Sequence, residues 1–241
     1  MFNRKKRRIE KESKQQQLGN SLITFTNPKS LNAEQFRSLR TNIEFAQVDK
    51  QIKSLLVSSS IPAEGKSTVS SNLAYVMAQT EKRVLLVDAD LRKPTVHRTF
   101  QLNNKQGLTT LLANPSLKFN EIVQYSREFN LFFLPSGPIP PNPSELLGSA
   151  KMKALMDELS NNFDIIIYDA PPVTAVADPQ ILATRVDGVL FIARHGYTRK
   201  EEIREAKKAL ENVNANVIGY VMNRQIMEES HGNYGYYGYT D

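Results

Sequence analysis

The chain has no cysteine, and no apolar run in it approaches the roughly 20 residues that a membrane-spanning helix needs. The missing cysteine rules out a disulfide framework and a catalytic thiolate. The first residues are charged, but no apolar stretch follows them, so we expect no secretory signal. Together these absences lead us to expect a cytoplasmic protein.

Histidine is also scarce. The three histidines, His97, His195 and His231, form no metal-ligand spacing, so we expect no histidine-based metal site. The remaining composition, 40% hydrophobic and 23% charged over 241 residues, is that of a globular chain with enough length for one large domain.

The net charge of +6 is unevenly distributed, with a dense basic run at Arg4-Lys5-Lys6-Arg7-Arg8. This run is either a solvated tail or a contact for an anionic surface. No aromatic residues are interleaved with it, which favours a membrane surface over nucleic acid, and no nucleic-acid partner is expected. We divide the chain into a mobile basic arm (1–30), a nucleotide-binding domain (31–227) and a flexible Tyr/Gly-rich tail (228–241).

A phosphate-binding loop is predicted where the apolar run 55–57 leads through Gly65-Lys66-Ser67 into the helical pattern 69–79. Loop amides and the helix dipole attract an anion, Lys66 can reach the outer phosphates, and the Ser67 hydroxyl can hold Mg²⁺. The alternative is an ordinary turn with a glycine cap. The predicted nucleotide-binding residues here are Ser60, Pro62, Ala63, Glu64, Gly65, Lys66, Ser67 and Thr68.

Two apolar runs end in carboxylates: 84–87 is followed by Asp88 and Asp90, and 163–168 by Asp169. In an open α/β sheet the carboxyl ends of the strands face the ligand. We therefore predict that Lys66, Asp88, Asp90 and Asp169 form the catalytic site, with Mg²⁺ held by Ser67, Asp88 and Asp169. Either Asp88 or Asp90 could accept the proton of an incoming hydroxyl.

The fold class follows from strands that alternate with helices. Further strands are predicted at 131–134, 189–193 and 217–222, and helices at 149–159 and 199–212. This order predicts an α/β fold of the P-loop NTPase type, with a mostly parallel central sheet and helices on both faces. Asn223 and Arg224 end the last strand and either contact a nucleobase or form a simple turn.

A helix is predicted from Asn32, with Asn32 as its N-cap. Glu34, Arg37 and Arg40 then fall on successive turns. They form either a solvated face with one weak ion pair or a charged subunit interface, and spacing alone favours the solvated face.

The final segment carries tyrosines among glycines without any helical or strand period. Exposed tyrosines of this kind are either a low-complexity tail or phosphate acceptors. The candidate acceptors are Tyr234, Tyr236, Tyr237 and Tyr239. In contrast, Tyr75, Tyr125, Tyr168 and Tyr220 lie within periodic elements and are expected to be packed.

In combination these motifs resemble the bacterial tyrosine kinases of capsular and exopolysaccharide synthesis, the CpsD/CapB family. The resemblance extends from about residue 30 to the end of the sequence. The matching stretches are the phosphate loop 60–68, the Asp-x-Asp motif 87–94, the strand 165–172, the helix motif 34–40, the proline-rich loop 136–143 and the tyrosine cluster 234–239.

The resemblance implies ATP and Mg²⁺, phosphoryl transfer to tyrosine, and autophosphorylation of the tail between neighbours in a homo-oligomeric ring. It implies that Glu34, Arg37 and Arg40 form the oligomer interface. It also implies a membrane adaptor of the CpsC/CapA type, which would hold the kinase at the inner face of the membrane, and a cognate tyrosine phosphatase. Ala63 departs from the glycine that many members carry, a change expected to cost little if φ is negative there.

The rival interpretation is a positioning ATPase of the ParA/MinD kind, which phosphorylates no protein. Those proteins carry a second lysine five residues before the catalytic one, and Ile61 occupies that position here. They also lack a terminal tyrosine cluster.

Overall fold

The structure is a computed structural model that describes residues 19–46 and 52–225. The basic run at 4–8 and the four candidate acceptor tyrosines lie outside the described residues. Within the described part, no helix combines the length and the apolar character needed to cross a membrane.

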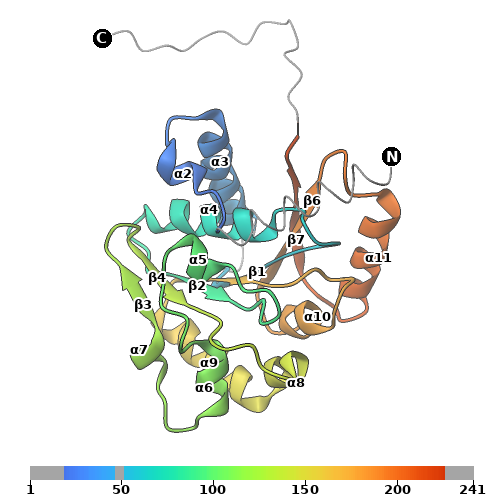
Figure 1. Ribbon diagram of the computed structural model, residues 1–241. Coiled ribbons are helices and arrows are strands. Elements are labelled where there is room, and N and C mark those ends of the chain that lie inside the picture. The colour runs from blue at the N-terminus through green and yellow to red at the C-terminus, as the bar shows by residue number, and fades with distance from the viewer. Residues whose placement is uncertain (1–18, 47–51, 226–241) are drawn as a thin grey trace, which may run out of the picture.

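A seven-stranded sheet forms the centre of the molecule, in the order β3-β4-β2-β5-β1-β6-β7 (Figure 1). Only the edge strand β3 runs antiparallel to its neighbour, so the predicted mostly parallel sheet is confirmed. The strands are β1 (Ser54–Ser59), β2 (Val84–Asp88), β3 (Gln124–Ser126), β4 (Leu131–Leu134), β5 (Ile165–Asp169), β6 (Gly188–Arg194) and β7 (Val217–Asn223).

Helices cover both faces of the sheet, which explains why the central strands are apolar without alternation. One face packs on α2 (Ile23–Thr26), α3 (Leu31–Phe45), α4 (Lys66–Ala78) and α5 (Val96–Thr99). The other packs on α6 (Leu108–Ala113), α7 (Phe119–Ile122), α8 (Pro143–Gly148), α9 (Ala150–Asn162), α10 (Asp178–Ala183) and α11 (Lys200–Glu211).

The N-terminal boundary of the domain differs from the prediction. Residues 19–30, expected in a mobile arm, include α2 and pack on α4. The Asn72 side chain ties them down: its Nδ2 donates to the Ser21 carbonyl (2.8 Å), and its Oδ1 accepts from the Thr24 amide (3.0 Å). The cap of α3 is also corrected, because Ser30, not Asn32, accepts the amide of Ala33.

Besides α2 and α5, two short elements were not predicted. The chain leaves α7 at Ile122 and turns into β3, which pairs with β4. The helix α10, which begins with Asp178, was not predicted. Both elements are short, so they carry little periodicity, and their stability comes from the neighbours they pack against.

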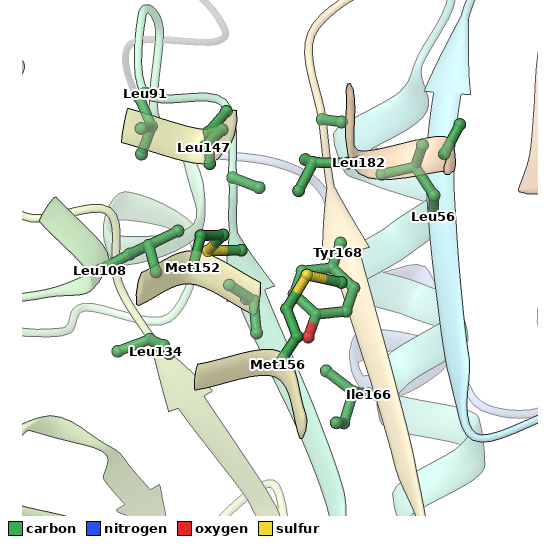
Figure 2. Packing of buried hydrophobic residues seen from close by; sticks show 14 of the residues in the cluster. Leu56, Leu91, Leu108, Leu134, Leu147, Met152, Met156, Ile166, Tyr168 and Leu182 are labelled. Atoms are coloured by element: carbon green, nitrogen blue, oxygen red, sulfur yellow. The ribbon is translucent and has the colours of Figure 1, made fainter. Parts of the chain in front are cut away.

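The tyrosines within periodic elements divide into two groups. Tyr168 is fully buried, with its ring among the apolar side chains of one core (Figure 2). Tyr125 and Tyr220 are about half exposed and pack one side of their rings against Phe132 and Phe191, so the expectation that they are packed is confirmed only in part. Both lie on strands at the edges of the sheet, where one flank has no neighbouring strand among the described residues.

Candidate functional site

The predicted phosphate loop joins β1 to α4. Lys66 is the first residue of α4, and Gly65 caps it with φ 95°. The first helical hydrogen bond runs from the Val69 amide to the Gly65 carbonyl (2.9 Å). The amides of Gly65, Lys66, Ser67 and Thr68 precede that bond and have no acceptor within the helix, which makes this helix end an anion site.

Ala63 adopts the left-handed region, with φ 68°. This corrects the expectation of a negative φ. A side chain in this region costs about 1 kcal/mol, which a glycine would avoid. The loop therefore holds a strained residue directly before its phosphate-binding amides.

Two predicted nucleotide-binding residues use their side chains to brace the loop. The Ser60 hydroxyl donates to the buried Glu64 carboxylate at 2.9 Å, and the Ile61 amide donates to it at 2.8 Å. The Thr68 hydroxyl donates to Oδ1 of Asn20 at 3.2 Å, while Pro62 is exposed.

Lys66 is paired with the predicted carboxylates. Its Nζ donates to Oδ2 of Asp90 at 2.8 Å and to Oγ of Ser67 at 3.1 Å, and it lies 3.8 Å from Oδ1 of Asp169. The structure thus brings together the phosphate loop and the ends of two strands.

Asp88 and Asp169 end the neighbouring strands β2 and β5 in register, and both are fully buried. Oδ2 of Asp88 accepts the amides of Thr95 and Val96, each at 3.0 Å. Oδ1 of Asp88 and both oxygens of Asp169 accept no hydrogen bond from the described residues. These buried oxygens accept no hydrogen bond and favour a nearby cation or a proton, and for Oδ1 of Asp169 the Lys66 ammonium at 3.8 Å is one such cation.

The charges of the site act on one another. Burial raises the pKa of Asp88 well above its ordinary value, and the charges of Asp169 and Asp90 add to that effect. Burial also acts to raise the pKa of Asp90, but the Lys66 ammonium outweighs it, so that pKa lies below its ordinary value. For Lys66, burial is outweighed by Asp169 and Asp90, and its pKa is raised.

The donor set suits Mg²⁺ together with a nucleotide. No group of three or more His, Asp or Glu side chains in the described residues is arranged to hold a metal ion by itself. Mg²⁺ in nucleotide sites takes only one or two carboxylates and fills its shell with water and phosphate oxygens. The unpartnered oxygens of Asp88 and Asp169 and the hydroxyl of Ser67 fit that need.

Asn223 lies against the phosphate loop. Its Nδ2 donates to the Glu64 carbonyl at 2.8 Å, and a side chain at Gly65 would meet this nitrogen at 2.0 Å. Arg224 follows with φ 56°, and its amide donates to Oδ1 of Asn223. The end of β7 therefore contacts the phosphate loop, and the positive φ of Gly65 together with the close approach of Asn223 favours glycine at residue 65. Contact of Asn223 and Arg224 with a nucleobase stays a prediction.

Arg92 follows Asp90 and contacts residues of α10 and α8. Its Nε donates to Oδ2 of the fully buried Asp178 at 2.8 Å, and its Nη2 donates to the hydroxyl of Ser144 at 3.2 Å. Asp178 and Ser144 were not identified from the sequence, because they lie in α10 and α8, far along the chain. An acidic residue at the start of a helix followed by proline was the available signal.

The helix motif of α3 contains two different contacts. Glu34 and Arg37 form an exposed ion pair at 2.6 Å. Arg40 instead donates from Nη1 to the Val76 carbonyl in the last turn of α4 at 2.8 Å. Arg40 therefore fastens α3 to α4 within one chain.

Comparison with known proteins first defines a class. A family model described as "AAA domain" matches residues 63–218, which covers the phosphate loop and the strands that follow it. The chain is therefore a nucleotide-binding protein of the P-loop class, in agreement with the sheet and the site.

The relatives define the family more closely. The chain is 50% identical over 221 residues to tyrosine-protein kinase YwqD of Bacillus subtilis (strain 168), covering 92% of each chain. It is 38% identical to putative tyrosine-protein kinase CapB of Staphylococcus aureus, covering 90% of this chain and 95% of that one. The solved chimerical protein CapA2B2 superposes with a TM-score of 0.81 at 37% identity, covering 90% of this chain and 98% of that one. The chain belongs to the bacterial tyrosine kinases of the CapB/YwqD type.

Proposed function

We propose that this kinase transfers the γ-phosphoryl group of ATP to the tyrosines of its own C-terminal cluster, Tyr234, Tyr236, Tyr237 and Tyr239, with one copy acting on another. The observation that carries the proposal is the placement of Lys66 between Asp90 and Asp169 at the start of α4. One cation and a row of free amides suit the phosphates, and the buried carboxylates beside them suit Mg²⁺ and the incoming hydroxyl.

Each residue has a definite task in this proposal. Lys66 would leave Asp90 and neutralise the outer phosphates, since several phosphate charges together attract an ammonium more strongly than one carboxylate does. Ser67 and Asp88 would hold Mg²⁺, with Asp169 in or near its shell; the ion would neutralise charge on the phosphates. Asp88 or the released Asp90 would orient the tyrosine hydroxyl and take its proton.

The wider setting rests on the relatives and on the chimera. CapA2B2 joins a CapA part to a CapB part, which supports an adaptor of the CapA type as the partner of this chain. Through that adaptor the kinase would lie at the inner face of the membrane and regulate capsular or exopolysaccharide synthesis. A homo-oligomeric ring joined through Glu34 and Arg37, and a cognate phosphatase, complete the proposal.

The decisive experiment separates donor from acceptor. The donor is a chain that ends at Glu229 and keeps Lys66; the acceptor is the full chain with Lys66→Met. Both are mixed with ATP, Mg²⁺ and a CapA-type cytoplasmic tail. Phosphotyrosine on the acceptor is the expected result, because only the acceptor carries the tyrosine cluster and only the donor carries the lysine.

Two controls define the outcome. Lys82→Met, which removes a surface lysine paired with Glu44, should leave phosphorylation unchanged. If the mixture hydrolyses ATP but never forms phosphotyrosine, the proposal fails and the positioning-ATPase interpretation replaces it.

A further inference from the structure

The phosphate loop contains a buried carboxylate that the reaction does not use. Glu64 is fully buried and accepts hydrogen bonds from the Ser60 hydroxyl, the Ile61 amide and the Thr198 hydroxyl. A carboxylate at this point would repel a phosphate unless hydrogen-bond donors within the protein compensated its charge. The donors to Glu64 come from the loop itself and from Thr198.

Arg194 is the last residue of β6, and Thr198 lies in the turn between β6 and α11. The Thr198 hydroxyl oxygen accepts the Arg194 amide at 2.8 Å while its proton goes to Glu64. The Arg194 guanidinium, on a residue only 3% exposed, donates from Nη1 to the Ala63 carbonyl at 3.1 Å and lies 4.7 Å from the centre of the Tyr197 ring. A single turn therefore holds two consecutive residues of the loop.

These contacts fall where the loop is most strained. Ala63 and Gly65, on either side of Glu64, both have positive φ, at 68° and 95°. A strained backbone persists only where its surroundings fix it. The residue between them is fixed by three strand ends: Ser60 after β1, Thr198 after β6, and Asn223 of β7 on the Glu64 carbonyl.

We propose that Thr198 and Arg194 are positioning residues of this kinase, which act through Glu64 and Ala63 to hold the phosphate loop in its anion-binding form before the nucleotide arrives. The proposal rests on the proposed binding of ATP at this loop. Pre-formed amides bind phosphates without a further cost of ordering. Loss of the contacts that Thr198 and Arg194 make with the loop should therefore weaken nucleotide binding equally in the ground state and in the transition state. Such a loss raises KM and leaves kcat nearly unchanged.

The test uses isosteric variants of residue 198. Thr198→Val removes the hydroxyl and keeps the shape, whereas Thr198→Ser keeps the hydroxyl. Thr184→Val is the matched control, because the Thr184 hydroxyl makes only a local bond to the Ile181 carbonyl. We expect Thr198→Val to weaken the binding of Mg²⁺-ADP, measured by calorimetry, about tenfold, with the serine and control variants near wild type.

Kinetics give the second readout: KM for ATP should rise about tenfold in Thr198→Val, while kcat stays within about threefold. Binding of Mg²⁺-ADP is measured without any phosphorylation, so a failure of the kinase assay in wild type would sink the proposed function and leave this test standing. The proposal is overturned if Thr198→Val binds Mg²⁺-ADP with wild-type affinity, or if Thr198→Ser binds it as weakly as Thr198→Val does.

A double-mutant cycle covers the case in which Thr198→Val also lowers stability. If Thr198 acts through Glu64, the valine change should weaken Mg²⁺-ADP binding about tenfold in wild type and less than twofold in a Glu64→Gln background. Equal effects in both backgrounds would show that Thr198 acts by another route and would overturn the proposal.

Discussion

The ammonium of Lys66 donates a 2.8 Å hydrogen bond to the Asp90 carboxylate, so the cation expected to bind phosphate is already paired inside the protein. In the proposed function, nucleotide binding at this site would exchange one anion for another. The same pairing links the reaction to the stability of the fold, because neither partner is more than slightly exposed.

Replacing Lys66 tests both consequences. Lys66→Met should reduce phosphotransfer at least a hundredfold and lower the free energy of unfolding by about 3 kcal/mol at neutral pH, since buried carboxylates lose their cation. The pKa of Asp90 is lowered by folding and that of Lys66 is raised. The stabilisation from Asp90 is thus lost as pH falls through its folded pKa, and that from Lys66 as pH rises through its own.

The measurement is chemical denaturation of wild type and Lys66→Met without nucleotide at several pH values. The difference in the free energy of unfolding between wild type and Lys66→Met should be largest near pH 7 and should disappear as the pH falls below 4. A difference that stays constant as the pH falls would show that the Lys66–Asp90 pair contributes little to stability.

Removing the charge of Asp88 should stabilise the nucleotide-free protein, because burial and the acidic neighbours of Asp88 raise its pKa. Asp88→Asn should abolish phosphotransfer but raise the free energy of unfolding of the nucleotide-free protein by about 1 kcal/mol or more at pH 7. A raised folded pKa means that stability is lost as pH rises above the unfolded value. The gain from asparagine should therefore shrink toward pH 4, which thermal unfolding across pH can check; destabilisation at pH 7 would contradict it.

Arg40→Ala and Arg37→Ala should lower the free energy of unfolding by different amounts. Arg40→Ala removes a half-buried bond to the last turn of α4 and should cost about 1–2 kcal/mol of unfolding free energy. Arg37→Ala breaks an exposed ion pair with Glu34 and an exposed hydrogen bond to the Pro28 carbonyl, and should cost less, about 0.5–1 kcal/mol.

The proposed ring interface is therefore best tested with Arg37→Ala, because it leaves the fold intact. Light scattering should show smaller assemblies for Arg37→Ala, with unfolding like wild type. Assemblies of unchanged mass would remove Arg37 from the interface.

Ala63→Gly should be neutral or stabilising, in contrast to the usual effect of a new glycine. The left-handed φ at residue 63 strains alanine, and its removal should yield up to about 1 kcal/mol, partly offset by the greater freedom of glycine in the unfolded chain. Ala154→Gly, at an exposed position in the middle of helix α9, is the control and should destabilise. Equal losses in both variants would argue against the left-handed conformation.

Tyr168→Phe should stabilise the protein. The Tyr168 hydroxyl is buried among apolar side chains and has no hydrogen-bond partner in the described structure (Figure 2). Its removal should relieve about 1 kcal/mol of desolvation cost without changing phosphotransfer. A loss of stability, measured by denaturation, would reveal a partner such as a buried water.

The sequence by itself determined the sheet and the main site. Strands that are buried on both faces must be continuously apolar, and Asp88 and Asp169 follow such runs directly. Because parallel strands end on the same side, Lys66 and the carboxylates had to meet. The helix start at Gly65-Lys66 was equally local, since the residues that make it are consecutive.

Only the tertiary structure decided where the other polar groups find their partners. Arg92 pairs with a residue 86 positions away, and Glu64 with Thr198, 134 positions away. Such contacts carry no spacing signal, because they form only after the order of the strands brings the loops together. The positive φ of Ala63 was hidden for the same reason: alanine prefers negative φ on its own, and the surrounding strand ends impose the other value.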